Sequence, residues 1–443
     1  MKNIRSGRSV LLRQIGLFAF ALYSVLLIGQ LRFVSAQGVG RFDRESARTM
    51  LDDVKDDLKN NYYDPGMRGM NLDVRVKEAE ARIDKAQTRD ELIIIIAQIM
   101  LDLNDSHTFF IPPFRAARVR YGWKMQMIGD ACIITDVNPK SDAATKGLKQ
   151  GDTVLTVDGY RPTRDNLWKM NYRYYALMPA RSINLSVRSP GDAKPHDIEV
   201  LAKIEKTEVK PEFYTNIWRY DSERRLEDDR FYEQGDVLVW RMPGFDVSPE
   251  RIDHLMDKVR KFKTLILDLR GNGGGHVATL ERLAGYFFDH DVKIADLKYR
   301  KELEPELAKT HGEKVFKGQL VVIVDSGSGS ASEMFARIVQ LETRGTIIGD
   351  RTAGAVMTSR NYDHKTGVGG TLYYGTRVTI ADVLMPDGKS LENVGVNPDE
   401  VRLPSASDIA ERRDPVLARA AAIAGIELAP EKAGTLFPIE WLK

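Results

Sequence analysis

Apolar positions recur at helical spacing near the start of the chain. Leu51, Val54, Leu58 and Tyr62 repeat every three or four residues, the period of one helix face. A second, strongly apolar segment runs over 92–103 and stops at the polar sequence that follows it. We therefore expect a helical N-terminal segment over residues 42–115, with a loop after its last helix.

The pattern changes between residues 118 and 205. Short runs of β-branched and apolar residues occupy 132–137, 154–157 and 183–187, and the second run ends in an Asp-Gly turn. A short helix is expected between the first two runs, over Pro-Lys-Ser-Asp-Ala-Ala. These features predict a small, separate β domain.

Strand-like and helix-like segments alternate through residues 206–404. The strands are expected at 237–241, 264–269 and 320–324, and the helices at 248–262, 278–288 and 331–341. This alternation favours a sheet covered by helices. The fold class is therefore mixed α+β, with an α/β core built on a mixed sheet, and residues 405–443 add a C-terminal helix and tail.

The charge of the protein is concentrated at its N-terminus. The formal net charge is +2, but residues 1–36 hold five basic residues and no acidic one, which leaves 60 basic against 63 acidic residues in the remainder. A nucleic-acid-binding protein would show a basic face or stripe instead. We therefore expect no nucleic-acid partner.

Residues 1–36 have the organisation of a signal peptide. An apolar run over 15–29 follows the basic residues, and Val34-Ser35-Ala36 supplies small residues for a cut before Gln37. The protein is therefore expected to be exported, to a periplasm or out of the cell. The alternative is an uncleaved segment that anchors the protein at a membrane.

Cysteine chemistry is nearly absent. Cys132 is the only cysteine, so an intramolecular disulfide is impossible, and it lies in an apolar run typical of a buried strand. No metal site and no organic cofactor are expected.

The first candidate for chemistry is Ser330. A buried strand runs into the small-residue loop Asp-Ser-Gly-Ser-Gly, and Ser330 follows at the start of a helix. Unpaired backbone N–H groups and the positive end of the helix dipole meet there, and such groups can stabilise an oxyanion. A purely structural alternative exists, because Ser330 and Glu333 also have the spacing of a capping box.

Four motifs, in this order, resemble the C-terminal-processing (tail-specific) serine peptidases. They are GLKQGDTVLTVDG (147–159), DLRGNGGG (268–275), SASE (330–333) and the stretch from PDG to LENVGVNPD (386–399). The resemblance implies a peptidase core of the ClpP/crotonase type with Ser330 as the nucleophile. It also implies an oxyanion hole formed by the N–H of Ala331 and that of Gly273 or Gly274.

The first of these motifs is similar to part of a PDZ domain. PDZ domains bind the end of an extended peptide by strand addition and hold its carboxylate on backbone N–H groups. The matching loop here is YGWKMQM (121–127), so Tyr121, Gly122 and Trp123 are the expected peptide-binding residues. This loop lacks the glycine-rich form that is common in eukaryotic PDZ domains.

One catalytic position departs from the family. Tail-specific peptidases activate their serine with a lysine 25 residues downstream, and this protein has Ala355 there. His107, in LNDSHTFF, resembles the histidine of the branch that includes the tricorn core protease, which pairs serine with histidine. A third group would orient that histidine: Glu392 is the main candidate, and Ser106 is the weaker one. The alternatives are a histidine packed against the core and a structural carboxylate.

The sequence thus predicts an exported serine endopeptidase with a PDZ-like domain at 118–205 and a peptidase core at 206–404. It would hydrolyse peptide bonds of peptides or unfolded proteins through a seryl acyl-enzyme. The alternative is a catalytically inactive peptide-binding protein that keeps the peptidase fold. Association into a homo-oligomer is left open.

Overall fold

The computed structural model describes residues 38–115, 117–206, 228–367, 371–439 and 441. The expected signal peptide and its cleavage point before Gln37 lie outside the described residues. Within the described ranges, no helix has the length and apolar character needed to cross a membrane.

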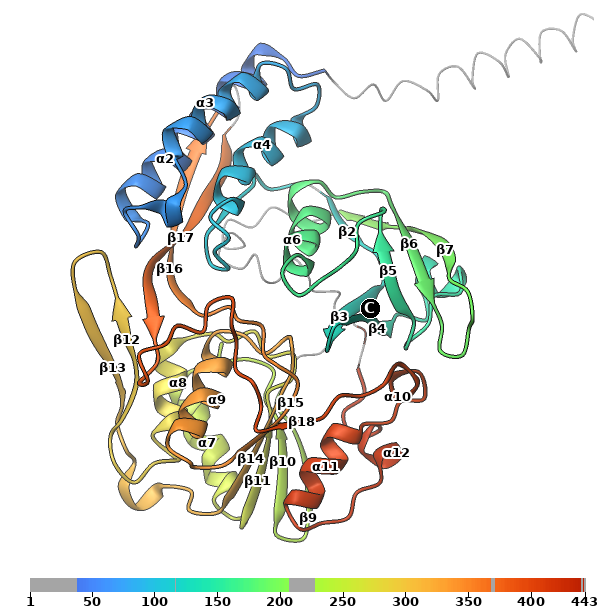
Figure 1. Ribbon diagram of the computed structural model, residues 1–443, viewed down its shortest axis with the longest axis vertical. Helices are drawn as coiled ribbons and strands as arrows, with labels where there is room; N and C mark the ends of the chain where they lie inside the picture. Colours follow the sequence, from blue (N-terminus) through green and yellow to red (C-terminus); the bar gives the residue numbers. More distant parts are fainter. Residues whose placement is uncertain (1–37, 116, 207–227, 368–370, 440, 442–443) are drawn as a thin grey trace, which may run out of the picture.

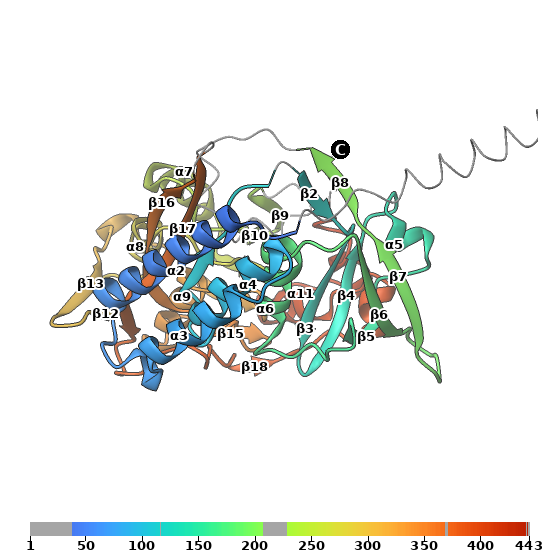
Figure 2. The same cartoon turned by 90° about the horizontal axis from the view of Figure 1, so that it is seen from above.

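Three helices form a lobe at one end of the molecule (Figures 1 and 2): α2 (Arg41–Asn61), α3 (Leu72–Ile83) and α4 (Arg89–Leu101). The side chains of Asn71 and Thr88 cap α3 and α4 by accepting hydrogen bonds from backbone N–H groups in the first turn. Leu51, Val54, Leu58 and Tyr62 are all buried, so the predicted helix face is confirmed.

An antiparallel sheet connects this lobe to the rest of the molecule. Its order is β1 (Phe109–Ile111), β17 (Leu372–Leu384), β12 (Val292–Lys298) and β13 (Leu303–Ala308), and β16 (Met357–Thr366) also pairs with β17. Tyr374 and Val378 of β17 belong to the hydrophobic core of the helices. The loop that carries His107 connects α4 to β1, so it lies where the helical lobe meets this sheet.

Residues 117–206 form the small β domain, which we call the module. Its antiparallel sheet has the order β3 (Trp123–Ile128), β4 (Ala131–Val137), β5 (Thr153–Val157), β6 (Ser182–Arg188) and β7 (His196–Leu201). The helices α5 (Asp142–Thr145) and α6 (Leu167–Tyr172) complete it, and β2 (Ala117–Arg120) pairs with β8 (Lys203–Lys206) where the backbone enters and leaves. Cys132 is buried in β4, as predicted.

The core is a six-stranded mixed sheet in the order β18 (Glu400–Val401), β15 (Thr346–Gly349), β14 (Gln319–Val324), β11 (Thr264–Asp268), β10 (Val237–Arg241) and β9 (Arg230–Gln234). All neighbours are parallel except β9, which is antiparallel to β10. The predicted mixed sheet is confirmed.

Helices cover both faces of this sheet. One face packs on α7 (Pro249–Val259), α8 (Val277–Ala284) and α9 (Ala331–Leu341), and the other on α11 (Pro415–Ile423) and α12 (Pro430–Ala433). Successive residues of each strand therefore enter different hydrophobic cores, as Val322 and Ile323 do. This burial on both faces explains the continuous apolar runs of the strands. The short α10 (Ala406–Ala410) precedes α11.

The long hairpin of β16 and β17 was not among the predicted elements. Many β16 residues are polar and partly exposed, so their sequence carries no apolar alternation. Lys365 lies in β16 opposite Tyr373. The strand is defined by its pairing with β17 rather than by its own residues, so its sequence alone did not predict it.

Candidate active site

Ser330 lies at the junction between a buried strand and a helix. β14 ends at Val324, a six-residue loop follows, and α9 begins at Ala331 with Ser330 as its N-cap residue. The carboxyl ends of the parallel strands open onto this loop, which is where α/β sheets bind their ligands.

The hydrogen bonds made by the serine hydroxyls distinguish Ser330 from the three serines near it in the sequence. Ser326 donates to the carbonyl oxygen of Met127, Ser328 donates to that of Leu269 over 2.8 Å, and Ser332 donates to that of Asn272 over 2.8 Å. The Ser330 hydroxyl has no such carbonyl partner among the described residues. Among these four hydroxyls, it is the one left available for chemistry.

The backbone of Ser330 is strained and firmly held. Its φ of 53° and ψ of −118° lie outside the regions that non-glycine residues normally occupy. Such conformations cost about 1–3 kcal/mol and persist where the surroundings enforce them. Here the Ser330 N–H donates to the carbonyl oxygen of Ala355 over 2.9 Å and to Oε2 of Glu333 over 3.1 Å. The capping-box carboxylate is therefore present, and it also accepts from the N–H groups of Gly354 and Ala355.

The glycine-rich turn after β11 packs directly against Ser330. A Cβ atom on Gly274, whose φ is +96°, would come within 2.6 Å of the Ser330 Cβ and 2.9 Å of the Ala331 nitrogen. Only glycine therefore fits at this position. The Gly274 N–H donates to Oδ1 of Asn272 over 2.9 Å, whereas the N–H groups of Gly273 and Ala331 have no acceptor among the described residues. Of the two predicted glycines, Gly273 is the one with an N–H available for an oxyanion.

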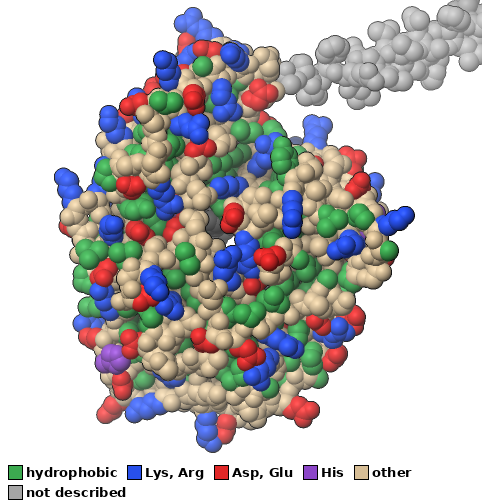
Figure 3. Space-filling model, in the orientation of Figure 1, with side chains coloured by type: hydrophobic (Ala, Val, Ile, Leu, Met, Phe, Trp, Pro, Cys, Tyr) green, Lys and Arg blue, Asp and Glu red, His purple; other side chains and the backbone are tan. Residues whose placement is uncertain are grey.

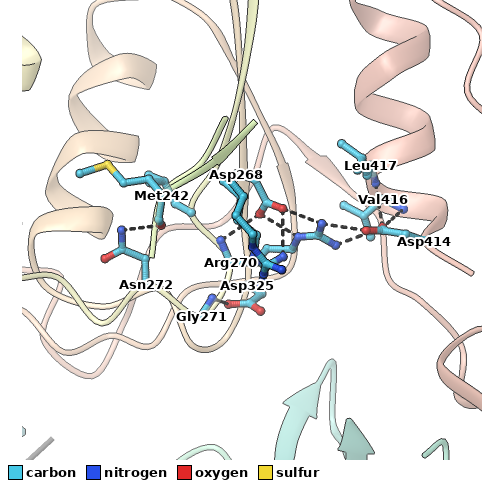
Figure 4. Close-up of polar contacts among 12 residues, drawn as sticks. Met242, Asp268, Arg270, Gly271, Asn272, Asp325, Asp414, Val416 and Leu417 are labelled. Carbon is cyan, nitrogen blue, oxygen red and sulfur yellow. Dashed lines mark hydrogen bonds and ion pairs between the residues drawn. The ribbon is translucent and has the colours of Figure 1, made fainter. Parts of the chain in front are cut away.

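Ion pairs of Arg270 hold this glycine-rich turn in place (Figure 4). Arg270 makes hydrogen bonds to both oxygens of Asp268 and of Asp414, the N-cap residue of α11. Burial alone would raise the pKa of Asp268, but the charges of Arg270 and Arg241 hold that pKa below its usual value. Oδ1 of Asp325 accepts from the Gly271 N–H over 2.8 Å, so the loop that carries Ser330 is tied to the glycine turn.

His107, Ser106 and Glu392 form a hydrogen-bonded series. Nδ1 of His107 lies 2.8 Å from Oγ of Ser106, which lies 2.8 Å from Oε2 of Glu392. The Ser106 N–H also donates to Oε1 of Glu392 over 2.8 Å. All three side chains are buried. Glu392 and Ser106, weighed as competing third groups on sequence grounds, are thus brought together in series.

The backbone of His107 is fixed from the helical lobe. Its N–H donates to Oδ1 of Asp105 over 2.9 Å, and that oxygen also accepts from the Thr379 hydroxyl over 2.7 Å. The other carboxylate oxygen accepts from the Tyr62 hydroxyl at the end of α2 over 2.9 Å. Asp105 is therefore a positioning residue that sequence reasoning did not identify, although its place two residues before His107 was visible.

Two consecutive residues connect the serine and histidine networks. The Ala355 carbonyl accepts from the Ser330 N–H, and the Val356 N–H donates to Oε2 of Glu392 over 3.0 Å. Ala355, at the position where tail-specific peptidases have a lysine, thus connects the two networks through its backbone. Lys365 is exposed on β16 and has no contact with this network.

Burial sets the protonation of this series. Burial, and then the positive charge of Arg377, lowers the pKa of His107 to about 3, so the imidazole is neutral at neutral pH. Burial, and then the negative charge of Asp105, raises the pKa of Glu392 to about 7, although three hydrogen bonds oppose this shift. Glu392 is therefore the member of the series that titrates near neutral pH.

The hydrogen-bond directions depend on that titration. Ionised Glu392 can only accept, so the Ser106 hydroxyl donates to it and accepts from Nδ1–H of His107. Nε2 of His107 then carries the lone pair that a general base needs. Protonation of Glu392 removes this constraint on the tautomer.

The predicted peptide-binding residues lie just before and at the start of β3, one of the two edge strands of the module's five-stranded sheet. The Tyr121 hydroxyl bonds to the backbone of Ala180, and the Gly122 carbonyl accepts from the Asn138 N–H. A shallow depression lies between β3 and the α6 region, lined by Tyr121, Trp123, Lys124, Met125, Asn171, Tyr174, Tyr175 and Ile183. The Trp123 Nε1–H is buried and has no partner among the described residues.

Strand β3 also contacts the loop that carries Ser330. Nε2 of Gln126 donates to Oδ2 of Asp325 over 2.6 Å, and the Met127 carbonyl accepts from the Ser326 hydroxyl. A second contact joins Arg164 of the module to Asp350 after β15, over 2.6 Å. The module is therefore held at the carboxyl ends of two core strands, beside Ser330.

Two family matches cover parts of the protein. Residues 236–402 match peptidase family S41, and residues 43–100 match the tricorn protease C1 domain. The first of these families comprises serine peptidases, so the prediction of a serine-type hydrolase is confirmed at the level of the family.

Curated peptidases and a solved structure are also similar to this protein. The chain is 25% identical to tricorn protease homolog 2 of Streptomyces coelicolor over 83% of its own length and 31% of the relative's. It is 23% identical to the chloroplastic C-terminal processing peptidase of Tetradesmus obliquus, over 76% of this protein and 73% of that one. The crystal structure of mature CPAF superposes with a TM-score of 0.64 at 14% identity, covering 83% of this protein and 94% of that one, which shows a shared fold.

Proposed function

We propose, from the premise that residues 236–402 form a domain of peptidase family S41, that this protein is a serine endopeptidase that uses a Ser–His pair. Ser330 is the nucleophile, His107 the general base and then the general acid, and Ser106 and Glu392 orient His107. The N–H groups of Gly273 and Ala331 stabilise the oxyanion.

In the first half-reaction, Oγ of Ser330 attacks the carbonyl carbon while its proton passes to Nε2 of His107. The negative charge forms on the carbonyl oxygen between the two N–H groups, where fixed donors are most effective. The C–N bond then breaks, and the leaving amine takes the proton from His107. A water molecule repeats these steps on the acyl-serine, releasing the acid and regenerating Ser330.

One observation carries this proposal. Hydrogen bonds run without interruption from Ser330 through Ala355 and Val356 to Glu392, Ser106 and His107. A histidine that merely packed against the core would not need a serine and a buried glutamate in series on its Nδ1. The match to the tricorn protease C1 domain over 43–100 also supports the Ser–His branch.

The module is proposed to be PDZ-like and to recognise the C-termini of its substrates. Its resemblance to PDZ sequences and the depression between β3 and α6 support this interpretation. Its contacts to the loop that carries Ser330 would bring a bound peptide close to this serine. The substrates are then peptides or unfolded proteins. The N-terminal sequence supports export, to a periplasm or out of the cell.

A serine-reactive fluorophosphonate probe tests this assignment. Wild type and the Ser326→Ala, Ser328→Ala and Ser332→Ala variants are expected to be labelled, the last two more slowly because their hydroxyls bond to buried carbonyls. Ser330→Ala should show no labelling. Labelling of Ser330→Ala at the wild-type rate would refute the nucleophile assignment. A wild type that is folded, binds peptides and is never labelled would favour a catalytically inactive peptide-binding protein.

A further inference from the structure

Arg377 lies in β17 beside the segment that carries His107. It is paired across β1 with Phe109, two residues after His107, and across β16 with Asn361. Its neighbours Thr376 and Val378 both point toward the helical lobe: Thr376 bonds to Asp57 of α2, and Val378 enters the core of the helices. Because side chains alternate along a strand, Arg377 projects from the opposite face of this sheet.

That face is turned toward the meeting point of the three parts of the molecule. Phe109, which shares the register of Arg377, has its ring 6.0 Å from that of Tyr172 in the module. The surface is hollowed where the lobe, the module and the core meet, with both basic and acidic side chains near its rim (Figure 3).

The guanidinium group of Arg377 has unused donors. Its Nε–H donates to Oγ of Ser359 over 2.7 Å, and its Cζ lies 6.0 Å from the Phe109 ring centroid. Among the described residues, neither of its terminal amino groups has an acceptor and no carboxylate forms an ion pair with it. Arg270 differs, because two carboxylates surround it. The described residues give this partly buried arginine no directly paired carboxylate, an arrangement that is costly unless a ligand supplies one.

The surroundings place this cation at the reaction centre. Its charge acts on His107 and lowers the pKa of the imidazole, second only to burial. Its own pKa is lowered by burial, and Asp246 opposes that shift. Asp246 follows Phe245, whose N–H donates to the carbonyl oxygen of Gly274 in the glycine turn over 2.8 Å. Arg377 therefore lies close to the segment of His107, and Asp246 follows a residue bonded to the glycine turn that packs on Ser330.

We propose that Arg377 is a specificity-determining residue that binds a carboxylate of the peptide substrate close to the scissile bond. The two free amino groups form the planar fork that pairs with a carboxylate through parallel hydrogen bonds. The carboxylate is either an acidic side chain or the C-terminus of the peptide. The proposal rests on the proposed function for the identity of the ligand as a peptide.

Peptide binding to a Ser330→Ala background tests the proposal without any need for cleavage. The first arm uses short C-terminally amidated peptides that carry Glu or Gln at each position in turn. In the Ser330→Ala protein, Glu should bind about tenfold more tightly than Gln at one position. Adding Arg377→Gln should reduce that ratio to about one.

The second arm compares neutral peptides with a free or an amidated C-terminus. Loss of the free-over-amide preference on Arg377→Gln identifies the peptide terminus as the source of the carboxylate; loss of the Glu-over-Gln preference identifies a side chain. Arg360→Gln, an exposed arginine of the adjacent strand, is the matched control and should change neither ratio.

If both ratios survive Arg377→Gln, the proposal is wrong. Should that variant fail to fold, Arg377→Lys keeps the charge without the fork, and an intermediate ratio is expected from it. An Arg377-dependent ratio in a protein whose wild type cleaves no peptide would refute the proposed function and leave this carboxylate site standing.

Discussion

At the scale of single residues, two buried glutamates hold the proposed catalytic residues Ser330 and His107. Glu333 accepts four hydrogen bonds that fix Ser330 and the segment before Val356, and Glu392 accepts three that fix Ser106 and Val356. Burial raises the pKa of both carboxyls to about 7. The protonation of the site near neutral pH is therefore a property of carboxylates, and not of the histidine.

This assignment predicts the pH dependence of the reaction. Glu392 has a raised pKa, so it gains a proton as the pH falls through about 7, and the tautomer of His107 that serves as a base is then no longer enforced. The kcat/KM of wild type should fall below about pH 7. A histidine with a pKa of about 3 would place that limb far lower.

The Glu392→Gln variant tests whether Glu392 or His107 sets the acid limb of the pH–rate profile. Its kcat/KM should be reduced at pH 8, and the limb near pH 7 should vanish because an amide does not titrate. The exposed Glu411→Gln is the control and should keep the wild-type profile. A Glu392→Gln enzyme that keeps a limb at the same pH would show that another group controls the reaction.

Sequence motifs proposed Ser330, His107 and Glu392 as site residues, and they proposed two glycines and Ala331 as candidate oxyanion donors. They could not rank Ser106 against Glu392, since residues 286 positions apart in the sequence meet only in the fold. Nor could they choose between Gly273 and Gly274. That choice depends on the hydrogen bond from Gly274 to Asn272, a detail of turn geometry.

At the scale of elements, the contact between α8 and β13 contains a carboxyl pair. Burial, and then the charge of Glu281, raises the pKa of Glu306 to about 7, and Oε2 of Glu306 is buried with no partner among the described residues. Below the ordinary pKa of a glutamate, Glu306 is protonated in both the folded and the unfolded protein, so its burial does not reduce the free energy of unfolding. Above about pH 7 the folded state must hold it ionised, so stability is lost as the pH rises through that value.

Glu306→Gln should therefore stabilise the protein at pH 8, by on the order of 1 kcal/mol after allowance for partial exposure. The gain should shrink toward zero near pH 5. Urea unfolding at the two pH values measures it, with the neighbouring exposed Glu304→Gln as the control. An equal effect at both pH values would mean that ionisation of Glu306 does not limit stability.

Elements were predictable where their residues enter a core. The central strands and the helices of the core carry apolar runs or stripes because both faces of the sheet are covered. The hairpin of β16 and β17 was missed because many β16 residues are polar and partly exposed, so this strand is defined by its pairing with β17 and not by an apolar pattern of its own. That hairpin carries Arg377 and Thr379, so these two residues near His107 were not predicted from the sequence either.

At the scale of the whole molecule, the site is assembled from distant parts. The helical lobe fixes His107 through Tyr62 and Asp105, the core supplies Ser330, and the C-terminal helix α11 braces the glycine turn through Asp414. The module contacts the loop that carries Ser330 through Gln126. Sequence could assign each part a role, but these contacts arise only when the parts pack together.

The most direct test of the Ser–His mechanism is the kcat/KM for cleavage of an unfolded peptide at pH 8 by wild type, His107→Ala and Lys365→Ala. His107 is proposed as the base, so His107→Ala should lose about 10²–10⁴-fold. Lys365 is exposed and outside the network, so Lys365→Ala should match wild type. A His107→Ala enzyme with wild-type kcat/KM, or a Lys365→Ala enzyme without activity, would contradict the mechanism.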